Sequence, residues 1–111
     1  MAQYVPKRGD FVIVSFNPQS GHEQKGRRPA LVISKTAFNR RTGFVFVCPI
    51  TNTKRKTPFH VPVGSASSLT GFVMVEQAKS LDYRSCHLSF VEEAPQQTLE
   101  DTLSILDAIL Y

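Results

Sequence analysis

The sequence predicts a small, mainly β protein that ends in an α-helix. Up to about residue 91, short runs of β-branched and aromatic residues alternate with breaks rich in glycine, proline and asparagine. After residue 95 the apolar residues change to helical spacing. Strands this short leave their edges exposed unless the sheet closes or is covered. We therefore expect a small β-barrel or strongly curled sheet, built as one domain over residues 1–111.

The strands are expected in chain order between clear breaks. They cover residues 11–16, 30–34, 44–50, 59–63, 72–76 and 86–91. The second run is apolar almost throughout, which predicts a central strand covered on both faces. Pro62 favours an edge position for the fourth strand, because proline cannot donate to a ladder. Residues 35–43 are interpreted as a polar connector, and residues 77–81 as a continuation or a bend of the fifth strand.

The C-terminal segment predicts an amphipathic helix. Its apolar positions fall on one face and include Leu99, Leu103, Leu106 and Leu110. The acidic residues lie outside this face. Pro95 suits the first turn of this helix. Thr98, three residues before Asp101, offers an alternative start through a capping box.

Composition narrows the class of protein. With 41% hydrophobic and 20% charged residues, the 111-residue chain is typical of a folded domain with one core. Cys48 and Cys86 lie far apart among apolar neighbours, so we expect buried, reduced thiols. No stretch is long enough to span a bilayer, which predicts a cytoplasmic protein without membrane contact. His22, His60 and His87 lack ligand spacing, so neither a metal site nor a cofactor is expected.

The charge is divided unevenly along the chain. Residues 1–60 carry eleven lysines and arginines against two acids, a net charge of +9, and residues 61–111 have a net charge of −5. A basic half of this strength suits a polyanion such as nucleic acid, or an acidic peptide. A solvated basic face without a partner is the alternative.

Two polar loops carry side chains that suit a phosphodiester. Cleavage of RNA through its own 2′-hydroxyl needs a base, a group that stabilises charge on the phosphorane, and an acid for the leaving oxygen. Glu23 could be the base, and the planar fork of Arg28 could hold two phosphate oxygens. The hydroxyl of Thr51 could donate to the same phosphate if the strands at 30–34 and 44–50 pair antiparallel. Each residue also has an ordinary interpretation, as a surface ion pair, a solvated loop cation or a turn hydroxyl.

Taken together, the motifs resemble those of the MazF/PemK toxin family between about Tyr4 and Leu81. The matching residues, in order, are Gly9-Asp10, Asn17-Pro18, Gly21, Glu23-Gln24, Gly26, Arg28-Pro29, Leu31-Val32-Ile33-Ser34, Pro49, Thr51, Pro58-Phe59 and Gln77-x-Lys79-Ser80. The resemblance implies an SH3-like barrel of the MazF/CcdB type with a C-terminal helix, and a homodimer. It implies a toxin of a type II toxin-antitoxin system that arrests growth, with a MazE-like antitoxin as partner.

The resemblance also implies an activity: metal-independent, sequence-specific cleavage of single-stranded mRNA to 2′,3′-cyclic phosphate and 5′-hydroxyl ends. By this resemblance Arg28 and Thr51 form the catalytic pair, and Glu23 matches a loop glutamate implicated in activity. The expected RNA-binding residues are Asn17, Gln24, Lys25, Arg27, Thr53, Lys54, Arg55, Lys56, Gln77 and Lys79. Asn17, Asn52 and the basic run 54–56 depart from the common family pattern, and they bear on which RNA sequence is recognised.

Two non-enzymatic alternatives remain at the level of the sequence. The same barrel occurs in CcdB-like toxins that poison DNA gyrase, and small basic barrels also serve as passive RNA-binding modules. Gyrase poisoning does not require Arg28-Pro29 and Thr51.

Overall fold

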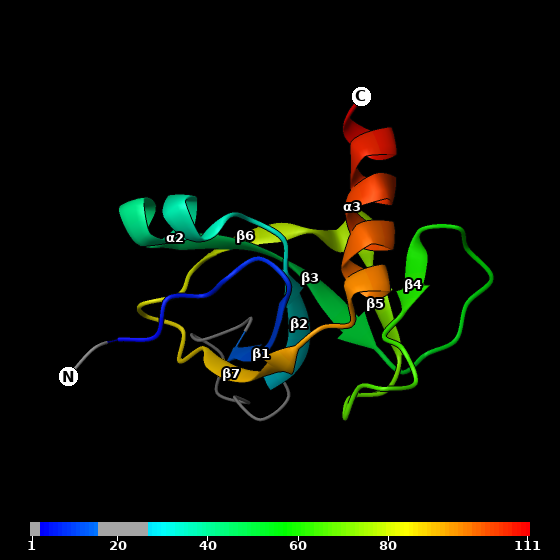
Figure 1. The fold of residues 1–111 in the computed structure, drawn as a ribbon, viewed down its shortest axis with the longest axis horizontal. Coiled ribbons are helices and arrows are strands. Elements are labelled where there is room, and N and C mark those ends of the chain that lie inside the picture. Colours follow the sequence, from blue (N-terminus) through cyan, green and yellow to red (C-terminus); the bar gives the residue numbers. More distant parts are fainter. Residues whose placement is uncertain (1–2, 16–26) are drawn as a thin grey trace.

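The computed structural model describes residues 3–15 and 27–111 and confirms the mainly β class with a C-terminal helix (Figure 1). The strands are β1 Asp10–Ser15, β2 Arg27–Val32, β3 Phe44–Thr51, β4 His60–Pro62, β5 Phe72–Met74, β6 Lys79–Asp82 and β7 Ser89–Glu93. The helices are α2 Thr36–Thr42, the 3₁₀ turn η1 Val75–Gln77 and α3 Gln96–Leu110.

The strands form one antiparallel sheet in the order β4-β5-β3-β2-β1-β7, and β6 also pairs with β3. Among the described residues no ladder joins β4 to β7, so the hydrogen bonds define an open sheet. Pro62 lies on the outermost strand β4, which confirms the edge prediction. Strand β2 lies between β1 and β3.

Both faces of β2 are buried, as the apolar run predicted. Leu31 belongs to one core cluster, with Phe11, Ile50 and residues of β4 and β5. Ala30 and Val32 belong to a second cluster on the other face, with Val14 and Tyr83 among others. The strand that carries Arg28 is therefore anchored in the core from both sides.

The first core cluster is covered by α3, which stands at one end of the sheet in Figure 1. The helix begins at Gln96 directly after Pro95, as predicted from proline. The alternative start at Thr98 was wrong. Thr98 is buried, and its hydroxyl donates to the carbonyl oxygen of Val63 at 3.1 Å, so it joins the helix to the end of β4.

Most predicted boundaries shift by a few residues, and β2 covers Arg27–Val32, so Arg28 lies within a strand and not in the loop before it. Three further differences change an element. Residues 36–42 form helix α2 and not a polar connector; the helix ends at Gly43, whose φ of 77° is favoured by glycine. The fifth strand ends at Met74 and turns into η1, and residues 79–82 form the separate strand β6. The last strand begins at Ser89, because residues 83–87 form turns.

Both cysteines are buried and free, as expected. Burial, together with the negative charge of Glu76, raises the pKa of Cys48 to about 12. Across residues 3–15 and 27–111, no helix is both long and apolar enough to cross a membrane.

Candidate active site

Arg28 and Thr51 come together across the β2–β3 ladder. These strands pair antiparallel with Ala30 opposite Pro49 and Leu31 opposite Cys48. The same register, continued by two residues, places Arg28 opposite Thr51. Both side chains line one cavity of about 520 Å³. The antiparallel pairing that the sequence analysis required is therefore confirmed.

The backbone around Thr51 fixes its hydroxyl. The N–H of Thr53 donates to Oγ1 of Thr51 at 3.1 Å. The hydroxyl thus accepts from the protein and keeps its own proton for an outside acceptor. Gly71, at a φ of 113°, lies so close that a Cβ there would be 2.3 Å from the carbonyl oxygen of Thr51. Glycine is needed at this position for β5 to approach β3.

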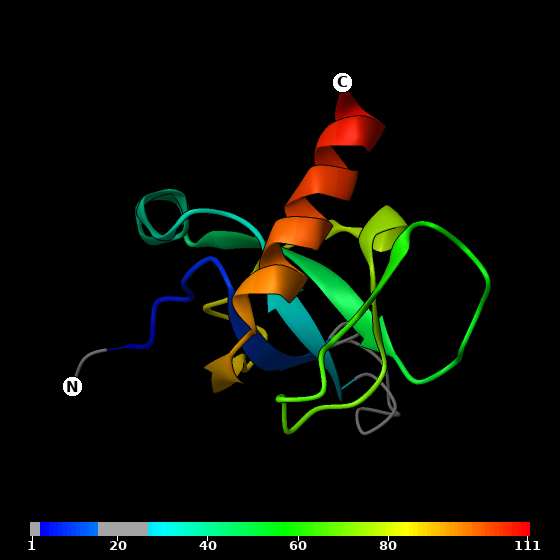
Figure 2. The ribbon, with the colours of Figure 1, turned by 45° about the vertical axis from the view of Figure 1, so that its right-hand side comes forward.

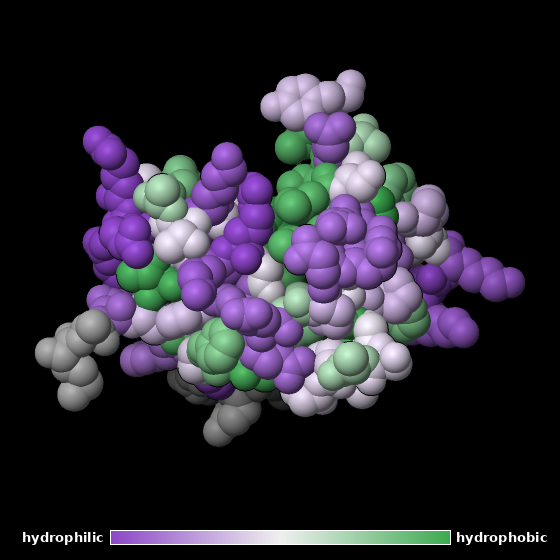
Figure 3. Space-filling view, viewed as in Figure 1, coloured by the Kyte–Doolittle hydropathy of each residue, from purple (hydrophilic) through white to green (hydrophobic). Residues whose placement is uncertain are grey.

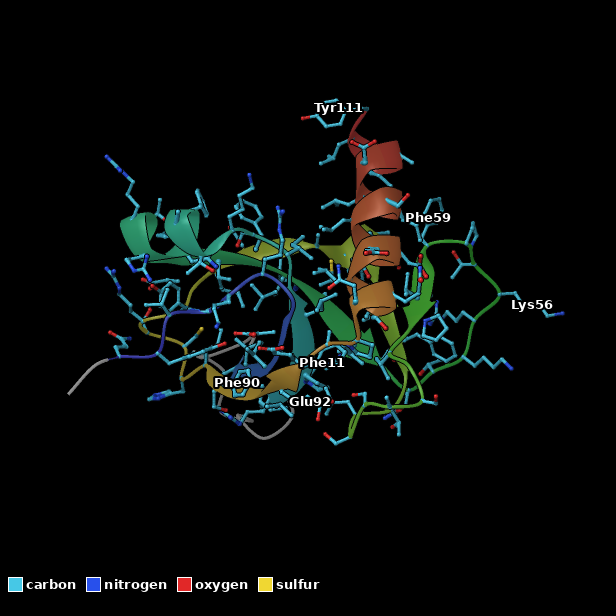
Figure 4. All side chains as sticks on the ribbon, in the orientation of Figure 1. Phe11, Lys56, Phe59, Phe90, Glu92 and Tyr111 are labelled. Carbon is cyan, nitrogen blue, oxygen red and sulfur yellow. The ribbon has the colours of Figure 1, made fainter. Side chains whose placement is uncertain are left out.

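The cavity is predominantly basic and opens beside the loop between β3 and β4. Figures 1 and 2 show this loop extending away from the sheet, and Figure 4 shows Lys56 on it. The residues that line the cavity are Arg28, Thr51, Thr53, Arg55, Lys56, Thr57, Phe59, His60, Met74, Glu76 and Gln77. Three cations thus face one carboxylate, together with an exposed aromatic ring, that of Phe59. A cationic cavity with hydroxyl donors and an aromatic surface suits a nucleotide phosphodiester.

A histidine and a glutamate form a pair in the same wall. Nε2 of His60 lies 3.1 Å from Oε2 of Glu76. The His60 side chain is 4% exposed and that of Glu76 is 39% exposed. Partial burial acts to raise the pKa of Glu76. The hydrogen bonds with His60, with its own backbone and with Gln77, and the charge interaction with His60, together outweigh it, and the pKa lies below the ordinary glutamate value.

Residues 7–110 match the model of the PemK-like, MazF-like toxin of type II toxin-antitoxin systems. The chain belongs to this toxin family. It is 38% identical over 109 residues to the endoribonuclease toxin ChpB of Escherichia coli strain K12, covering 94% of this chain and 93% of ChpB. It is 38% identical over 85 residues to the endoribonuclease toxin MazF of the same strain, covering 77% and 76% of the two chains.

Solved structures agree with this assignment. The crystal structure of MazF from Deinococcus radiodurans superposes with a TM-score of 0.87 at 40% identity, over 97% of this chain and 98% of that one. A MazE–MazF crystal structure from the same organism gives a TM-score of 0.85 at 34% identity, over 97% of both chains.

The MazF-like fold brings some of the predicted RNA-binding residues to the cavity and leaves others outside it. Thr53, Arg55, Lys56 and Gln77 line the cavity. Exposed side chains that do not line it are those of Arg27, Lys54 and Lys79. The guanidinium of Arg27 donates to the carbonyl oxygen of His87 at 3.4 Å. Asn17, Glu23, Gln24 and Lys25 lie outside the described residues.

Sequence reasoning missed His60 and Glu76 as members of this site. The expected strands 59–63 and 72–76 contain these residues, but nothing in the sequence indicates that the two side chains meet. Their meeting depends on the β4–β5 register, in which His60 pairs with Met74, and on the turn η1 that follows. Pro62 predicts that the strand containing His60 lies at an edge of the sheet. It does not indicate which strand pairs with that edge strand.

Within the described residues, no three His, Cys, Asp or Glu side chains gather as a metal site would require. Glu76 and His60 supply two such groups in the cavity. The other polar groups of the wall are cations, hydroxyls and the amide of Gln77.

Proposed function

We propose that this chain is the endoribonuclease toxin of a type II toxin-antitoxin system. It cleaves single-stranded mRNA within a short sequence by attack of the RNA 2′-hydroxyl, without a metal ion, and leaves 2′,3′-cyclic phosphate and 5′-hydroxyl ends. One observation carries the proposal: Arg28 of β2 and Thr51 of the neighbouring strand β3 line one basic cavity. The names of the related toxins ChpB and MazF support it.

The side chains suit the charge that develops during this reaction. The guanidinium of Arg28 binds two non-bridging phosphate oxygens, and it stays charged at any physiological pH. The Thr51 hydroxyl, held by the Thr53 N–H, donates to the same phosphate. Donors aimed at oxygens that gain charge in the transition state stabilise it more than they stabilise the bound substrate.

The basic loop provides the substrate path. Arg55 and Lys56 attract phosphates on either side of the scissile bond, and the exposed ring of Phe59 offers a surface on which a base can stack. Such contacts need single-stranded RNA, because the bases of a duplex are already stacked and paired. Gyrase poisoning is not favoured, since the relatives with known names are endoribonucleases.

The partner that we propose is a MazE-like antitoxin. The similar structures from Deinococcus radiodurans include MazE–MazF complexes. An acidic antitoxin segment would compete with RNA for the cations of the cavity, so that either the antitoxin or the substrate is bound.

We also propose that the toxin acts as a homodimer, and an apolar surface beside α3 supports this. Figure 3 shows apolar residues gathered along the side of α3 that faces α2. The lining of a hollow there is Ile33, Ser34, Phe46, Ala78, Leu106 and Leu110. Phe46 is 41% and Leu110 is 64% exposed, and Phe38 packs against Phe46 at its rim. A second copy would bury these side chains.

The activity is tested with a mixed-sequence RNA in the presence of EDTA. We expect new 5′-hydroxyl ends from the native protein and a loss of about 100-fold or more with Arg28→Ala, because the phosphate loses its bidentate donor. Arg41→Ala on the exposed side of α2 is the matched control and keeps the native rate. Absence of cleavage, or full activity in Arg28→Ala, would refute the proposed function.

A further inference from the structure

One side chain of β7 spans the gap that the sheet leaves between its two outermost strands. Glu92 accepts three hydrogen bonds from the loop between β4 and β5, residues 63–71. Its Oε2 accepts from the Ser67 hydroxyl at 2.7 Å and from the Ser68 N–H at 3.0 Å, and its Oε1 accepts from the Ser68 hydroxyl at 2.5 Å. Figure 4 shows Glu92 on the side of β7 toward this loop. One carboxylate therefore fastens the middle of the β4–β5 loop to the opposite edge of the sheet.

The carboxylate of Glu92 is ionised in this arrangement. The hydrogen bonds from the Ser68 hydroxyl, the Ser67 hydroxyl and the Ser68 N–H lower the pKa of Glu92 below the ordinary glutamate value. An ionised carboxylate accepts on both oxygens, and such hydrogen bonds are stronger than those between neutral groups. The Ser67 hydroxyl also accepts from the N–H of Leu69 at 3.0 Å, and Leu69 packs against the first core cluster. The loop is thus held to β7 and to the core at successive residues.

The end of the β4–β5 loop contacts the end of β3. The Thr70 hydroxyl donates to Oδ1 of Asn52 at 2.8 Å. Gly71 lies directly against the backbone of Thr51, and Phe72 pairs with Thr51 in the β3–β5 ladder. The residues that follow the Glu92 contact therefore hold Thr51 and its neighbour in place.

Asn52 connects this support to the hydroxyl of Thr51. It lies between Thr51, whose Oγ1 accepts a hydrogen bond, and Thr53, whose N–H donates that bond at 3.1 Å. Strand β3 ends at Thr51, so the ladder does not hold the residues after it. A displacement of Asn52 would consequently shift the Thr51 hydroxyl and its donor relative to Arg28 on β2.

We propose that Glu92 is a positioning residue for Thr51, an inference that rests on the proposed function. Glu92 does not line the cavity and acts through the β4–β5 loop and Asn52. Stabilisation of a developing charge by a hydroxyl depends strongly on where that hydroxyl lies. Loss of the Glu92 contact therefore slows the chemical step, whereas RNA affinity, which depends on the cations of the cavity, stays unchanged.

The maximal rate of single-turnover cleavage measures the chemical step. Glu92→Ala removes all three hydrogen bonds, and we expect this rate to fall about 10-fold, with less than about a twofold change in the Kd of an RNA that carries a 2′-O-methyl group at the cleavage position. Glu92→Gln keeps an acceptor for the Ser68 N–H and recovers part of the rate. Glu93→Ala removes an exposed carboxylate from the next position of β7, and this matched control keeps the native rate. A native rate in Glu92→Ala would overturn the inference.

A double-mutant cycle with Thr51 distinguishes positioning from a general loss of structure. If Glu92 acts through the Thr51 hydroxyl, Glu92→Ala has little further effect once Thr51→Val has removed that hydroxyl. We expect a loss of less than about twofold in the Thr51→Val background, against about 10-fold in the native background. Equal losses in the two backgrounds would show that Glu92 has only a structural role.

Thr70→Val tests the contact nearest to Thr51, and it replaces Glu92→Ala if that variant does not fold. It removes the hydroxyl that holds Asn52 and preserves the shape of the side chain. We expect the same loss of about 10-fold, again dependent on the Thr51 hydroxyl. Thr70→Ser keeps the donor and stays close to the native rate. Cleavage at the native rate by folded Thr70→Val would exclude the path through Asn52.

Failure of this inference differs from failure of the proposed function. If the native protein cleaves and Arg28→Ala does not, but Glu92→Ala cleaves at the native rate, the positioning role is wrong while the ribonuclease remains. Absence of cleavage by the native protein refutes the proposed function and this inference with it. Circular dichroism of each variant establishes that it is folded.

Discussion

The hydroxyl and backbone of Thr51, which we propose to contact the phosphate, are held in place by neighbouring backbone groups. The N–H of Thr53 occupies one of its lone pairs, and the close approach of Gly71 fixes the backbone from the other side. The sequence identified Thr51 only by its position after an apolar run and by resemblance. Neither the Gly71 contact nor the Thr53 hydrogen bond could be predicted, because each depends on how β3 meets β5.

Two substitutions at Thr51 separate the hydroxyl from the shape of the side chain. Thr51→Val preserves shape but removes the donor, and we expect a loss of about 100-fold in cleavage rate, typical for one donor to a developing charge. Thr51→Ser keeps the donor and stays much closer to the native rate. Cleavage by Thr51→Val at the native rate would show that the hydroxyl takes no part.

At the scale of elements, the predicted strands and the final helix were largely right. The strands are runs of β-branched and aromatic residues between clear breaks, and the helix has its apolar residues at a period of 3.6. Helix α2 was missed because residues 35–43 carry no apolar periodicity. Its stability comes from tertiary hydrogen bonds of one buried residue, Asn39. The side-chain amide donates to the carbonyl oxygens of Pro6 at 2.9 Å and Ser34 at 3.2 Å, and Oδ1 accepts from the Ser34 hydroxyl.

Asn39 is therefore expected to be a major contributor to stability. Asn39→Ala leaves the buried carbonyl of Pro6, the carbonyl of Ser34 and the Ser34 hydroxyl without this partner, and we expect the free energy of unfolding to fall by about 2–3 kcal/mol. Arg41→Ala, on an exposed position of the same helix, is expected to change it by less than about 0.5 kcal/mol. Urea denaturation of both variants provides the measurement. Equal stabilities would mean that α2 is held by other contacts.

The sequence predicted Arg28 and Thr51 as parts of the candidate site but not His60 and Glu76, because the second pair depends on tertiary structure. Arg28 lies near the start of β2 and Thr51 ends β3, so a simple antiparallel pairing of these neighbouring strands joins them. His60 and Glu76 meet through an edge strand of three residues and a 3₁₀ turn, whose register no pattern in the sequence determines.

At the scale of the whole molecule, the uneven charge and the apolar surface serve different proposed partners. The cations of the cavity suit RNA or an acidic antitoxin, and the hollow beside α3 suits a second copy of the chain. The two surfaces involve different residues, so they can be tested independently.

The dimer is tested by placing a charge in the hollow. Leu110→Lys would bury an unpaired ammonium in the contact, and we expect sedimentation to show a shift from dimer to monomer. Phe90→Lys on β7, another exposed apolar position in Figure 4, is the matched control and leaves the dimer intact. A native protein that sediments as a monomer would exclude the homodimer.

The central claim is that the substrate itself supplies the nucleophile to a cavity built by Arg28 and Thr51. It is tested most directly by mapping one cleavage site in a mixed RNA and replacing only its 2′-hydroxyl with hydrogen. We predict that cleavage at that bond disappears while the modified RNA still competes with the native RNA for binding. Cleavage of the 2′-deoxy bond would contradict the mechanism.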